Sequence, residues 1–267
     1  MSDFLKALQL HSVHGDMAAD FAGTLRKIKA MGYDGVEFAG LHGQEPDSVR
    51  KILAETGLIP VSLHISYDDI AEEDPMQFIT LCKDLGCPQL VIAWMSLKYR
   101  PGGALFPDVM RRIRSFGELC REQGICPAYH NHAFEFVKID GEYALDVLLR
   151  EIPADCLDMQ FDTCWVNVGG VSPADYLRKY AGRMNTVHLK DYVGIFDENK
   201  YMQETEEENP HAFFYRPVGY GVQDMPAIVQ AARESGVTWF IVEQDVPSLG
   251  KTAMESAEMS VQYLQSL

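Results

Sequence analysis

The chain of 267 residues lacks the features that mark a membrane or secreted protein. No apolar run approaches the roughly 20 residues needed to span a bilayer, so we expect no membrane partner. The stretch MSDFLKALQLHSV has no basic segment followed by a long apolar run, unlike a signal peptide. The six cysteines form no Cys-x-x-Cys pair, which argues against a disulfide framework. Together these absences predict a protein of the reducing cytoplasm.

Positive charge is also scarce. The chain has 23 Lys and Arg against 39 Asp and Glu, which gives a net charge of −16. A surface this acidic repels phosphate backbones, so we expect no nucleic-acid partner. A glycine-rich phosphate turn is missing after the first apolar run, where the sequence reads HSVHGDM. That absence disfavours a doubly wound dinucleotide-binding fold.

What the chain does have is a regular alternation of short apolar runs and longer amphipathic stretches. We interpret the runs as strands, at residues 8–13, 35–39, 59–65, 89–95, 125–132, 157–162, 184–191 and 239–245. The stretches between them have apolar residues three and four positions apart, as in helices, and several end at glycine. Eight strand–helix units in about 250 residues is the size of a TIM barrel. We therefore predict an α/β fold, a single (β/α)8 TIM barrel over residues 1–267.

One connection is unusually long, from about residue 192 to 223. Loops of this length in compact domains are usually functional or disordered. This one follows the C-terminal end of a strand, where barrel active sites lie. It contains the aromatic residues Phe213, Phe214 and Tyr215, followed by Arg216. We predict a lid-like loop, with Arg216 as a substrate-binding residue.

Four polar residues lie near the ends of four apolar runs: Glu135, Asp162, His188 and Glu243. In a barrel these ends open into one basin. Carboxylates grouped in one basin repel one another unless cations compensate. Three carboxylates and one imidazole are an oxygen-rich ligand set. We predict one divalent metal, Mn²⁺ in the first place, with Mg²⁺, Co²⁺ and Zn²⁺ as alternatives.

Other polar residues also stand at predicted strand ends. They are His11, Glu37, His64, His130, His132, Lys190 and Asp245. A single histidine in such a place is often a packing residue, but several around one basin indicate a binding site. Among them we take Glu37 and His64 as candidate substrate-binding residues.

Such a metal site has a definite chemical use. A divalent ion with open positions can hold the two adjacent oxygens of an α-hydroxycarbonyl and stabilise the enediolate formed when the C–H group loses its proton. One carboxylate near that carbon can act as the base, and another on the opposite face can return the proton. This chemistry predicts an isomerase or epimerase acting on a ketose or related keto sugar.

Six motifs follow one another over nearly the whole chain: GYDGVEFAG, AYHNHAFEF, QFDTCWVNVGG, NTVHLKDY, PVGYG and FIVEQD. With them the chain resembles the sugar phosphate isomerase/epimerase group of xylose-isomerase-like TIM barrels. The resemblance implies a metal held by Glu135, Asp162, His188 and Glu243. It also implies that Glu135 and Glu243 form the acid/base pair on opposite faces of a small-molecule sugar substrate.

The resemblance also implies contacts with the sugar. His132 and Lys190 would bind substrate oxygens, and Trp165 would stack on a C–H face of the sugar, although a core aromatic is the alternative for Trp165. One departure is Tyr220 in PVGYG, where many relatives have Gly-Glu-Gly. This departure leaves the subtype and the substrate less well defined than the metal site.

Three other functions stay open. A lyase shares the first half of the mechanism and would expel a leaving group from a keto-inositol, a dehydroshikimate-like acid or a 3-keto-glycoside. A non-catalytic sugar-binding barrel would not need the carboxylates. An endonuclease IV-type enzyme needs three metals and more histidines, but this chain has Trp165 in DTCW and no Asp-x-His after HLKD.

The sequence also leaves open whether the substrate is phosphorylated and whether the protein forms oligomers. Amides of VGYG (218–221) and the charge of Arg216 could bind a phosphate group. A glycine turn alone is weak evidence, so we favour an unphosphorylated substrate. By the same resemblance, a homodimer or homotetramer is expected.

Overall fold

The computed structural model describes residues 4–201, 203 and 205–267. Eight parallel strands form a closed barrel in the spatial order β1-β12-β9-β8-β5-β4-β3-β2. The strands are β1 (Leu5–Gln9), β2 (Gly35–Phe38), β3 (Ile59–Ser66), β4 (Gln89–Trp94), β5 (Cys126–His130), β8 (Asp158–Asp162), β9 (Met184–Leu189) and β12 (Trp239–Val242). The predicted (β/α)8 fold is confirmed.

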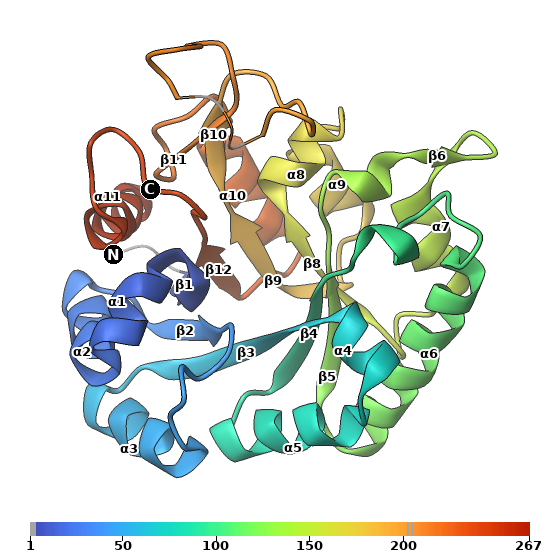
Figure 1. The fold of residues 1–267 in the computed structure, drawn as a ribbon, viewed down its shortest axis with the longest axis horizontal. Coiled ribbons are helices and arrows are strands. Elements are labelled where there is room, and N and C mark those ends of the chain that lie inside the picture. The colour runs from blue at the N-terminus through green and yellow to red at the C-terminus, as the bar shows by residue number, and fades with distance from the viewer. Residues whose placement is uncertain (1–3, 202, 204) are drawn as a thin grey trace.

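Helices surround the barrel (Figure 1). The longer ones are α2 (Phe21–Met31), α3 (Pro46–Thr56), α5 (Pro75–Leu85), α6 (Phe106–Glu122), α7 (Ala144–Glu151), α9 (Pro173–Lys179), α10 (Met225–Glu234) and α11 (Ala253–Ser266). Short helices follow some strands: α1 (His14–Ala19), α4 (Tyr67–Glu72) and α8 (Thr163–Val168). Gly57 and Gly86 end α3 and α5 with positive φ angles of 67° and 74°, a conformation that glycine adopts without steric cost. None of the described helices is both long and apolar enough to cross a membrane.

The first strand is displaced from its predicted position. Residues 8–13 were expected to form it, but β1 spans Leu5–Gln9 and Leu10–Val13 form a 3-10 turn, η1. The Gln9 side chain accepts a hydrogen bond from the backbone N–H of His11, and this local bond begins the turn. His11 consequently lies on the loop beyond the strand end.

The apolar core lies mainly between the strands and the outer helices. Inside the barrel, a layer of polar side chains takes the place of the apolar filling usual in this fold. These buried side chains belong to Gln9, Glu37, Ser62, Gln89, His130, Gln160, Thr186 and His188. Buried polar groups are costly unless they are paired. The composition of this layer therefore indicates a site below the strand ends.

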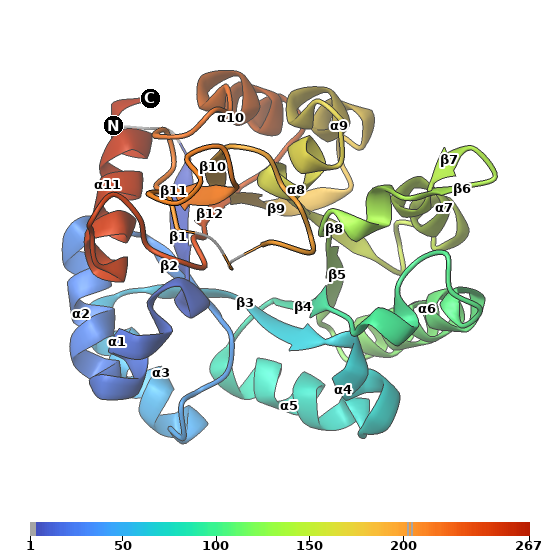
Figure 2. The same ribbon diagram turned by 45° about the horizontal axis from the view of Figure 1, so that its top comes forward.

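The long connection folds back over the C-terminal ends of the strands. Its ends form an antiparallel pair, β10 (Asp191–Val193) and β11 (Phe214–Arg216), and the described residues between them project above the barrel (Figures 1 and 2). Tyr192, Phe213 and Tyr215 pack against Cys164 and Trp165 of α8. The connection thus covers one side of the barrel mouth, while its function as a lid stays a prediction.

The turn PVGYG is held from inside the protein. The carboxylate of Asp191 accepts hydrogen bonds from the backbone N–H groups of Gly219 at 3.1 Å, Gly221 at 2.9 Å and Gln223 at 3.3 Å. The Gly219 and Gly221 amides belong to VGYG, which was predicted as a possible phosphate site, and both are already engaged by Asp191. Tyr220 is half exposed, near Tyr263 on α11.

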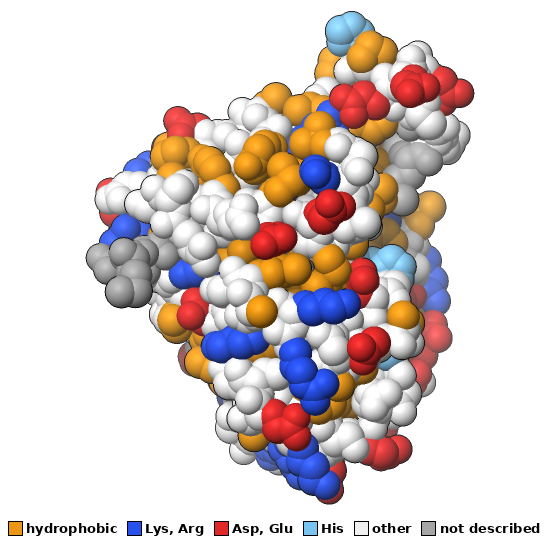
Figure 3. All heavy atoms as spheres, turned by 90° about the vertical axis from the view of Figure 1, so that its left-hand side faces the viewer, with side chains coloured by type: hydrophobic (Ala, Val, Ile, Leu, Met, Phe, Trp, Pro, Cys, Tyr) orange, Lys and Arg blue, Asp and Glu red, His pale blue; other side chains and the backbone are white. Residues whose placement is uncertain are grey.

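The outer surface mixes charges of both signs. On the face shown in Figure 3, acidic, basic and apolar side chains are intermingled. The expectation of no nucleic-acid partner stays a prediction.

Asp146 on α7 is expected to make folding stability depend on pH. Burial alone would raise the pKa of its carboxyl, but hydrogen bonds from Lys179, Tyr176 and Tyr180 hold that pKa below its usual value. Because the folded pKa is lowered, the stabilisation is present above the unfolded pKa of about 3.9 and is lost as the pH falls through the folded pKa. We expect Asp146→Asn to lower the free energy of unfolding by about 2 kcal/mol at pH 7.

Urea unfolding of wild type and Asp146→Asn from pH 7 to pH 2.5 checks this. The exposed Asp175 on α9 is the matched control, and Asp175→Asn should change stability by no more than about 0.5 kcal/mol. Two results would contradict the role of the Asp146 carboxylate. One is equal stability of Asp146→Asn and wild type at pH 7. The other is a difference in their free energies of unfolding that is the same at pH 2.5 as at pH 7.

Candidate metal centre

Four potential metal ligands meet at the C-terminal ends of four strands. His130 ends β5, Asp162 ends β8, His188 lies in β9, and Glu243 follows β12. One ligand atom from each lies within 4.8 Å of those of the other three, and all four residues are buried. The strand register contributes directly, because Asp162 on β8 pairs with His188 on β9.

His188 lies between two carboxylates. Its Nε2 is 2.6 Å from Glu37 Oε1, and its Nδ1 is 2.9 Å from Glu243 Oε2. Burial would lower the pKa of this imidazole, but the two carboxylates raise it to about 10. At neutral pH both ring nitrogens therefore donate, Nε2 to Glu37 and Nδ1 to Glu243, and a metal bound at Nδ1 would take the place of its proton. A carboxylate behind a histidine is the usual arrangement at metal sites, because it fixes the tautomer of the ligand.

Asp162 supplies the observation that best fits a bound cation. Its Oδ1 accepts hydrogen bonds from the backbone N–H groups of Cys164 and Trp165, which caps α8 and fixes the carboxylate. Its Oδ2 is fully buried and has no hydrogen-bond partner among the described residues. The Lys190 ammonium lies 3.4 Å from this oxygen and partly offsets its charge, and a metal ion here would give it the direct partner that a buried carboxylate oxygen needs.

Lys190 provides positive charge beside this group. Its Nζ lies 2.8 Å from Glu243 Oε2, 3.3 Å from Asp245 Oδ2 and 3.4 Å from Asp162 Oδ2. Burial would lower the pKa of the ammonium, but the three carboxylates raise it well above its usual value. Lys190 is therefore a charged donor on the wall of the site.

Glu135 does not join the group. It lies in the 3-10 turn η3 (Phe134–Phe136), where its Oε1 accepts a hydrogen bond from the Tyr129 hydroxyl at 2.6 Å and its Oε2 accepts one from the His132 N–H at 2.8 Å. Burial raises the pKa of this carboxyl to about 8. In the group of potential ligands the fourth atom comes from His130, and Glu135 as a metal ligand stays a prediction.

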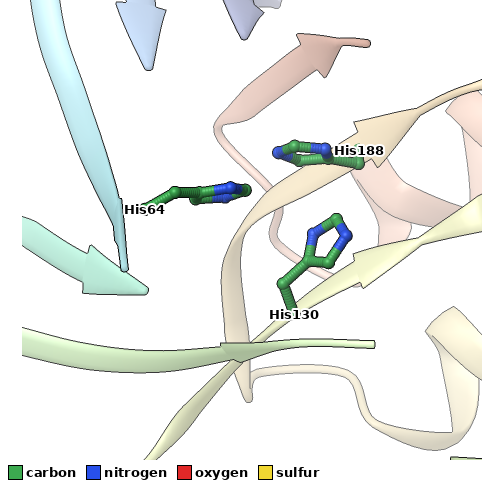
Figure 4. Close-up of side chains that lie close together, drawn as sticks. All are labelled: His64, His130 and His188. Atoms are coloured by element: carbon green, nitrogen blue, oxygen red, sulfur yellow. The ribbon is translucent and has the colours of Figure 1, made fainter. Parts of the chain in front are cut away.

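Three histidine rings gather below the mouth of the barrel (Figure 4). His64 and His188 stack with ring centroids 5.2 Å apart, and the edge of His130 faces His188 at 4.6 Å. Burial and the neighbouring imidazoles lower the pKa of His130 well below its usual value. A neutral imidazole is the form that binds metals.

Glu37 is fully buried, and its carboxylate links several side chains of the interior polar layer. Its carboxylate faces donors from five side chains, namely Gln9, Ser62, His64, Gln160 and His188. Burial would raise the pKa of Glu37, but the charges and hydrogen bonds of His64 and His188 hold it well below its usual value. The residue is predicted as a substrate ligand, but the structure places it behind His188.

A cavity of about 920 Å³ opens above the metal group. Of the predicted substrate-binding residues, four contribute to its lining, namely His64, His132, Trp165 and Lys190. Arg216 is buried away from that lining and pairs with Glu206 at 2.5 Å. Of the two predicted catalytic carboxylates, Glu243 lines the cavity, whereas Glu135 is not among its described lining residues.

His132 lines the cavity and has one nitrogen that makes no hydrogen bond. Its Nδ1 is buried and has no hydrogen-bond partner among the described residues. Burial and the nearby Lys190 lower the pKa of this imidazole to about 3, so it is neutral near pH 7. As a neutral ring it can form a hydrogen bond with a bound molecule without carrying charge.

Comparison with known proteins decides the family. A model described as "Xylose isomerase-like TIM barrel" matches residues 25–267. The chain belongs to this family. Among curated relatives of this xylose isomerase-like barrel are the inosose dehydratases of Geobacillus kaustophilus, 27% identical over 188 residues, and Geobacillus thermodenitrificans, 27% identical over 156 residues. The matches cover 62% and 57% of this chain but only 60% and 51% of those relatives.

Solved structures of the family share the fold over the whole chain. A sugar phosphate isomerase/epimerase from Parabacteroides distasonis has a TM-score of 0.75 at 21% identity and covers 100% of this chain and 95% of its own. A probable 3-DHS dehydratase from Bacillus anthracis has a TM-score of 0.76 at 14% identity and covers 98% of both chains. A Mycobacterium smegmatis family member, determined in complex with magnesium, has a TM-score of 0.70 at 17% identity and covers 99% of this chain and 96% of its own. Proteins that share this fold are thus named both as isomerase/epimerases and as dehydratases.

Proposed function

We propose that this xylose isomerase-like barrel is a divalent-metal-dependent lyase. Its substrate would be an unphosphorylated cyclic keto-polyol or keto sugar with a leaving group β to the carbonyl. The proposal rests on one observation: Glu243 lines the cavity, while Glu135, the second carboxylate expected for epimerisation, is held elsewhere by Tyr129 and His132.

The metal would be held by His130, Asp162, His188 and Glu243. The unpartnered Asp162 Oδ2 and the Glu37–His188 contact fit such an ion. When bound, the metal would supply a Lewis acid for the carbonyl oxygen of the substrate. Two imidazoles and two carboxylates suit Mn²⁺, Co²⁺ and Zn²⁺, and Mn²⁺ remains our first choice.

The protein's own groups divide the remaining work. Glu243 would accept the proton from the carbon next to the carbonyl, because it is the ionised carboxylate on the cavity wall. The Lys190 ammonium would stabilise the negative charge that develops on oxygen. His132 follows β5, three strands round the barrel from β12, and would donate a hydrogen bond to the departing group.

Elimination requires less of the site than epimerisation does. An epimerase must return a proton to the opposite face of the same carbon, which calls for a second acid on that side. A lyase needs one base and one donor for the leaving group. The names of the curated relatives, inosose dehydratases, agree with elimination. Isomerisation or epimerisation was our first choice from the sequence and becomes the alternative that the test must exclude.

An unphosphorylated substrate agrees with how the candidate phosphate ligands are used. The amides of Gly219 and Gly221 donate to Asp191, and Arg216 pairs with Glu206. Location in the cytoplasm and assembly as a homodimer or homotetramer stay predictions.

The decisive experiment offers Mn²⁺-loaded protein a panel of keto-inositols, 3-dehydroshikimate, 3-keto-glycosides and simple ketoses in D₂O. Ultraviolet absorbance detects a new conjugated enone, and NMR detects deuterium at carbon and any epimer. We expect elimination products from at least one cyclic keto compound, and at least a 100-fold loss of turnover in Glu243→Gln. Epimers with incorporated deuterium and no elimination would overturn the lyase in favour of an epimerase.

A further inference from the structure

A cluster of aromatic and cationic side chains lies on the cavity wall apart from the metal group. We call it the rim cluster and define it as Trp94, Arg100 and Phe134, all of which line the cavity. The Trp94 and Phe134 rings are nearly perpendicular, with centroids 6.2 Å apart. The Arg100 guanidinium lies over both rings, 4.9 Å from the centroid of Trp94 and 4.2 Å from that of Phe134. These contacts build a rigid apolar wall with one cation in it.

Trp94 is the member of the rim cluster that is not packed in the apolar core of the barrel. It ends β4, and 47% of its surface is exposed, although most large apolar side chains of the barrel are buried. An exposed indole inside a cavity indicates a ligand contact rather than a packing contact. Trp94 also meets the edge of His132, with ring centroids 5.2 Å apart. The rim cluster is therefore continuous with the proposed reaction site.

The cavity is larger than one sugar ring needs. Its volume of about 920 Å³ is near the upper end of the range of roughly 300–1,000 Å³ that encloses drug-sized ligands. Lys190 and Glu243 line the cavity at the metal group, whereas Trp94 and Phe134 contribute apolar surface at the rim cluster. A ligand that contacts both has a polyol part and a flat apolar part.

The hydrogen bonds of Arg100 argue against a phosphate or carboxylate at the rim. Its Nη1 donates to Glu198 Oε1 at 2.8 Å, and its Nε donates to the Met95 carbonyl at 3.4 Å. Two of the N–H groups with which the Arg100 guanidinium could bind an anion in bidentate fashion are thus already used. The guanidinium instead turns its face to the rings of Trp94 and Phe134. This geometry favours stacking of a flat π-system over recognition of a charge.

We propose that the rim cluster is a subsite for an aromatic substituent on the sugar, so that the substrate class is an aryl glycoside in its keto form. The inference rests on the proposed lyase function. In the reaction, the carbon next to the ketone would lose its proton to Glu243, and that electron pair would form a carbon–carbon double bond as the bond from carbon to the aryl oxygen breaks. The aryl oxygen would leave as a phenolate, accept a hydrogen bond from the neutral His132 ring and take its proton from water. The products are an unsaturated keto sugar and a phenol, with no change in oxidation state overall.

Binding of unreactive probes tests the subsite separately from catalysis. The probes are 4-nitrophenyl β-glucoside, methyl β-glucoside and cellobiose, none of which has the ketone needed for elimination. Isothermal titration of the full chain should give at least tenfold tighter binding of the nitrophenyl glucoside than of the methyl glucoside. Trp94→Ala should reduce this preference at least fivefold, and Trp94→Phe should restore part of it.

Leu97 provides the matched control. It is three residues from Trp94, 78% exposed and not among the described residues of the cavity lining, so Leu97→Ala should keep the full preference. Circular dichroism establishes that each variant is folded. Equal binding of the two glucosides by wild type, or a preference unchanged in Trp94→Ala, would overturn the subsite. Cellobiose tests the aryl assignment. If cellobiose also binds more tightly than the methyl glucoside, by as large a factor as the nitrophenyl glucoside and in a way that depends on Trp94, the subsite is for a second sugar and not for an aryl group.

Since these probes do not react, their binding is independent of whether the protein is a lyase. If the aryl preference is found but the panel of keto substrates shows only epimers, the subsite stands and the proposed function fails. If elimination is found without an aryl preference, the function stands and the subsite fails.

Discussion

Replacing His130 with alanine is expected to abolish stoichiometric Mn²⁺ binding, whereas replacing Glu135 with glutamine is expected to preserve it. His130 is one of the four buried residues whose ligand atoms meet within 4.8 Å. Removing one of four ligands leaves the other charged groups uncompensated and should weaken metal binding by more than 100-fold. Glu135 is held by Tyr129 and the His132 amide, and its pKa is raised to about 8 by burial, so an uncharged amide of the same shape can replace it.

Metal analysis after dialysis, together with isothermal titration of the metal-free protein, measures both variants. Wild type should bind one ion per chain. Glu135→Gln serves as the matched comparison, because it changes a buried carboxyl five residues from His130. Loss of binding in Glu135→Gln with retention in His130→Ala would restore the ligand set inferred from the sequence and refute the one proposed from the structure.

Replacing Glu37 with glutamine is expected to destabilise both the fold and the metal site. The Glu37 carboxylate faces donors from five side chains, and an amide would turn its own N–H groups towards some of them. Breaking a buried charged network of this kind costs about 3–5 kcal/mol of unfolding free energy. The metal affinity should fall by about 10–100-fold, because His188 loses the carboxylate that orients it.

Denaturant unfolding and metal titration measure the two effects of Glu37→Gln. An exposed carboxylate makes the control: Glu55 pairs with Arg26 on the surface, and Glu55→Gln should change stability by less than about 1 kcal/mol. A Glu37→Gln protein with wild-type stability and wild-type metal affinity would refute the role of Glu37 behind His188.

The fold could be predicted because its signal is repeated along the chain. Eight apolar runs alternate with helical stretches, and an error in one of them does not change the architecture. The first run shows such an error: the Gln9 side chain captures the His11 amide and begins a turn where the apolar pattern predicted strand. The apolar pattern indicates which residues are buried, not which of them form a strand. Leu10 and Val13 are buried as the pattern suggests, but they lie in the turn.

The candidate site was less predictable, because it depends on where single residues turn. Asp162, His188 and Glu243 lie at strand ends, and the structure brings them together, while their role as metal ligands stays a prediction. Glu135 follows the strand by five residues, and in the 3-10 turn its carboxylate accepts a hydrogen bond from Tyr129. His130, the last residue of β5, had the better position, and its alternation with His132 in AYHNH was the signal for it.

Other features of the site depend on contacts between distant parts of the chain. Glu37 and His188 are 151 positions apart, and their hydrogen bond follows from closure of the barrel. Arg216 was expected to meet the substrate because it follows aromatic residues in the long connection. It pairs instead with Glu206 of the same connection, a choice that no local pattern indicates.

The central claim is that one divalent ion binds between His130, Asp162, His188 and Glu243. A crystal of the protein grown with Mn²⁺ and measured at the manganese absorption edge tests it most directly. The account predicts one anomalous peak per chain in contact with these four side chains, with Glu135 still bonded to Tyr129. A peak on Glu135 in place of His130, or no peak at full Mn²⁺ loading, would contradict it.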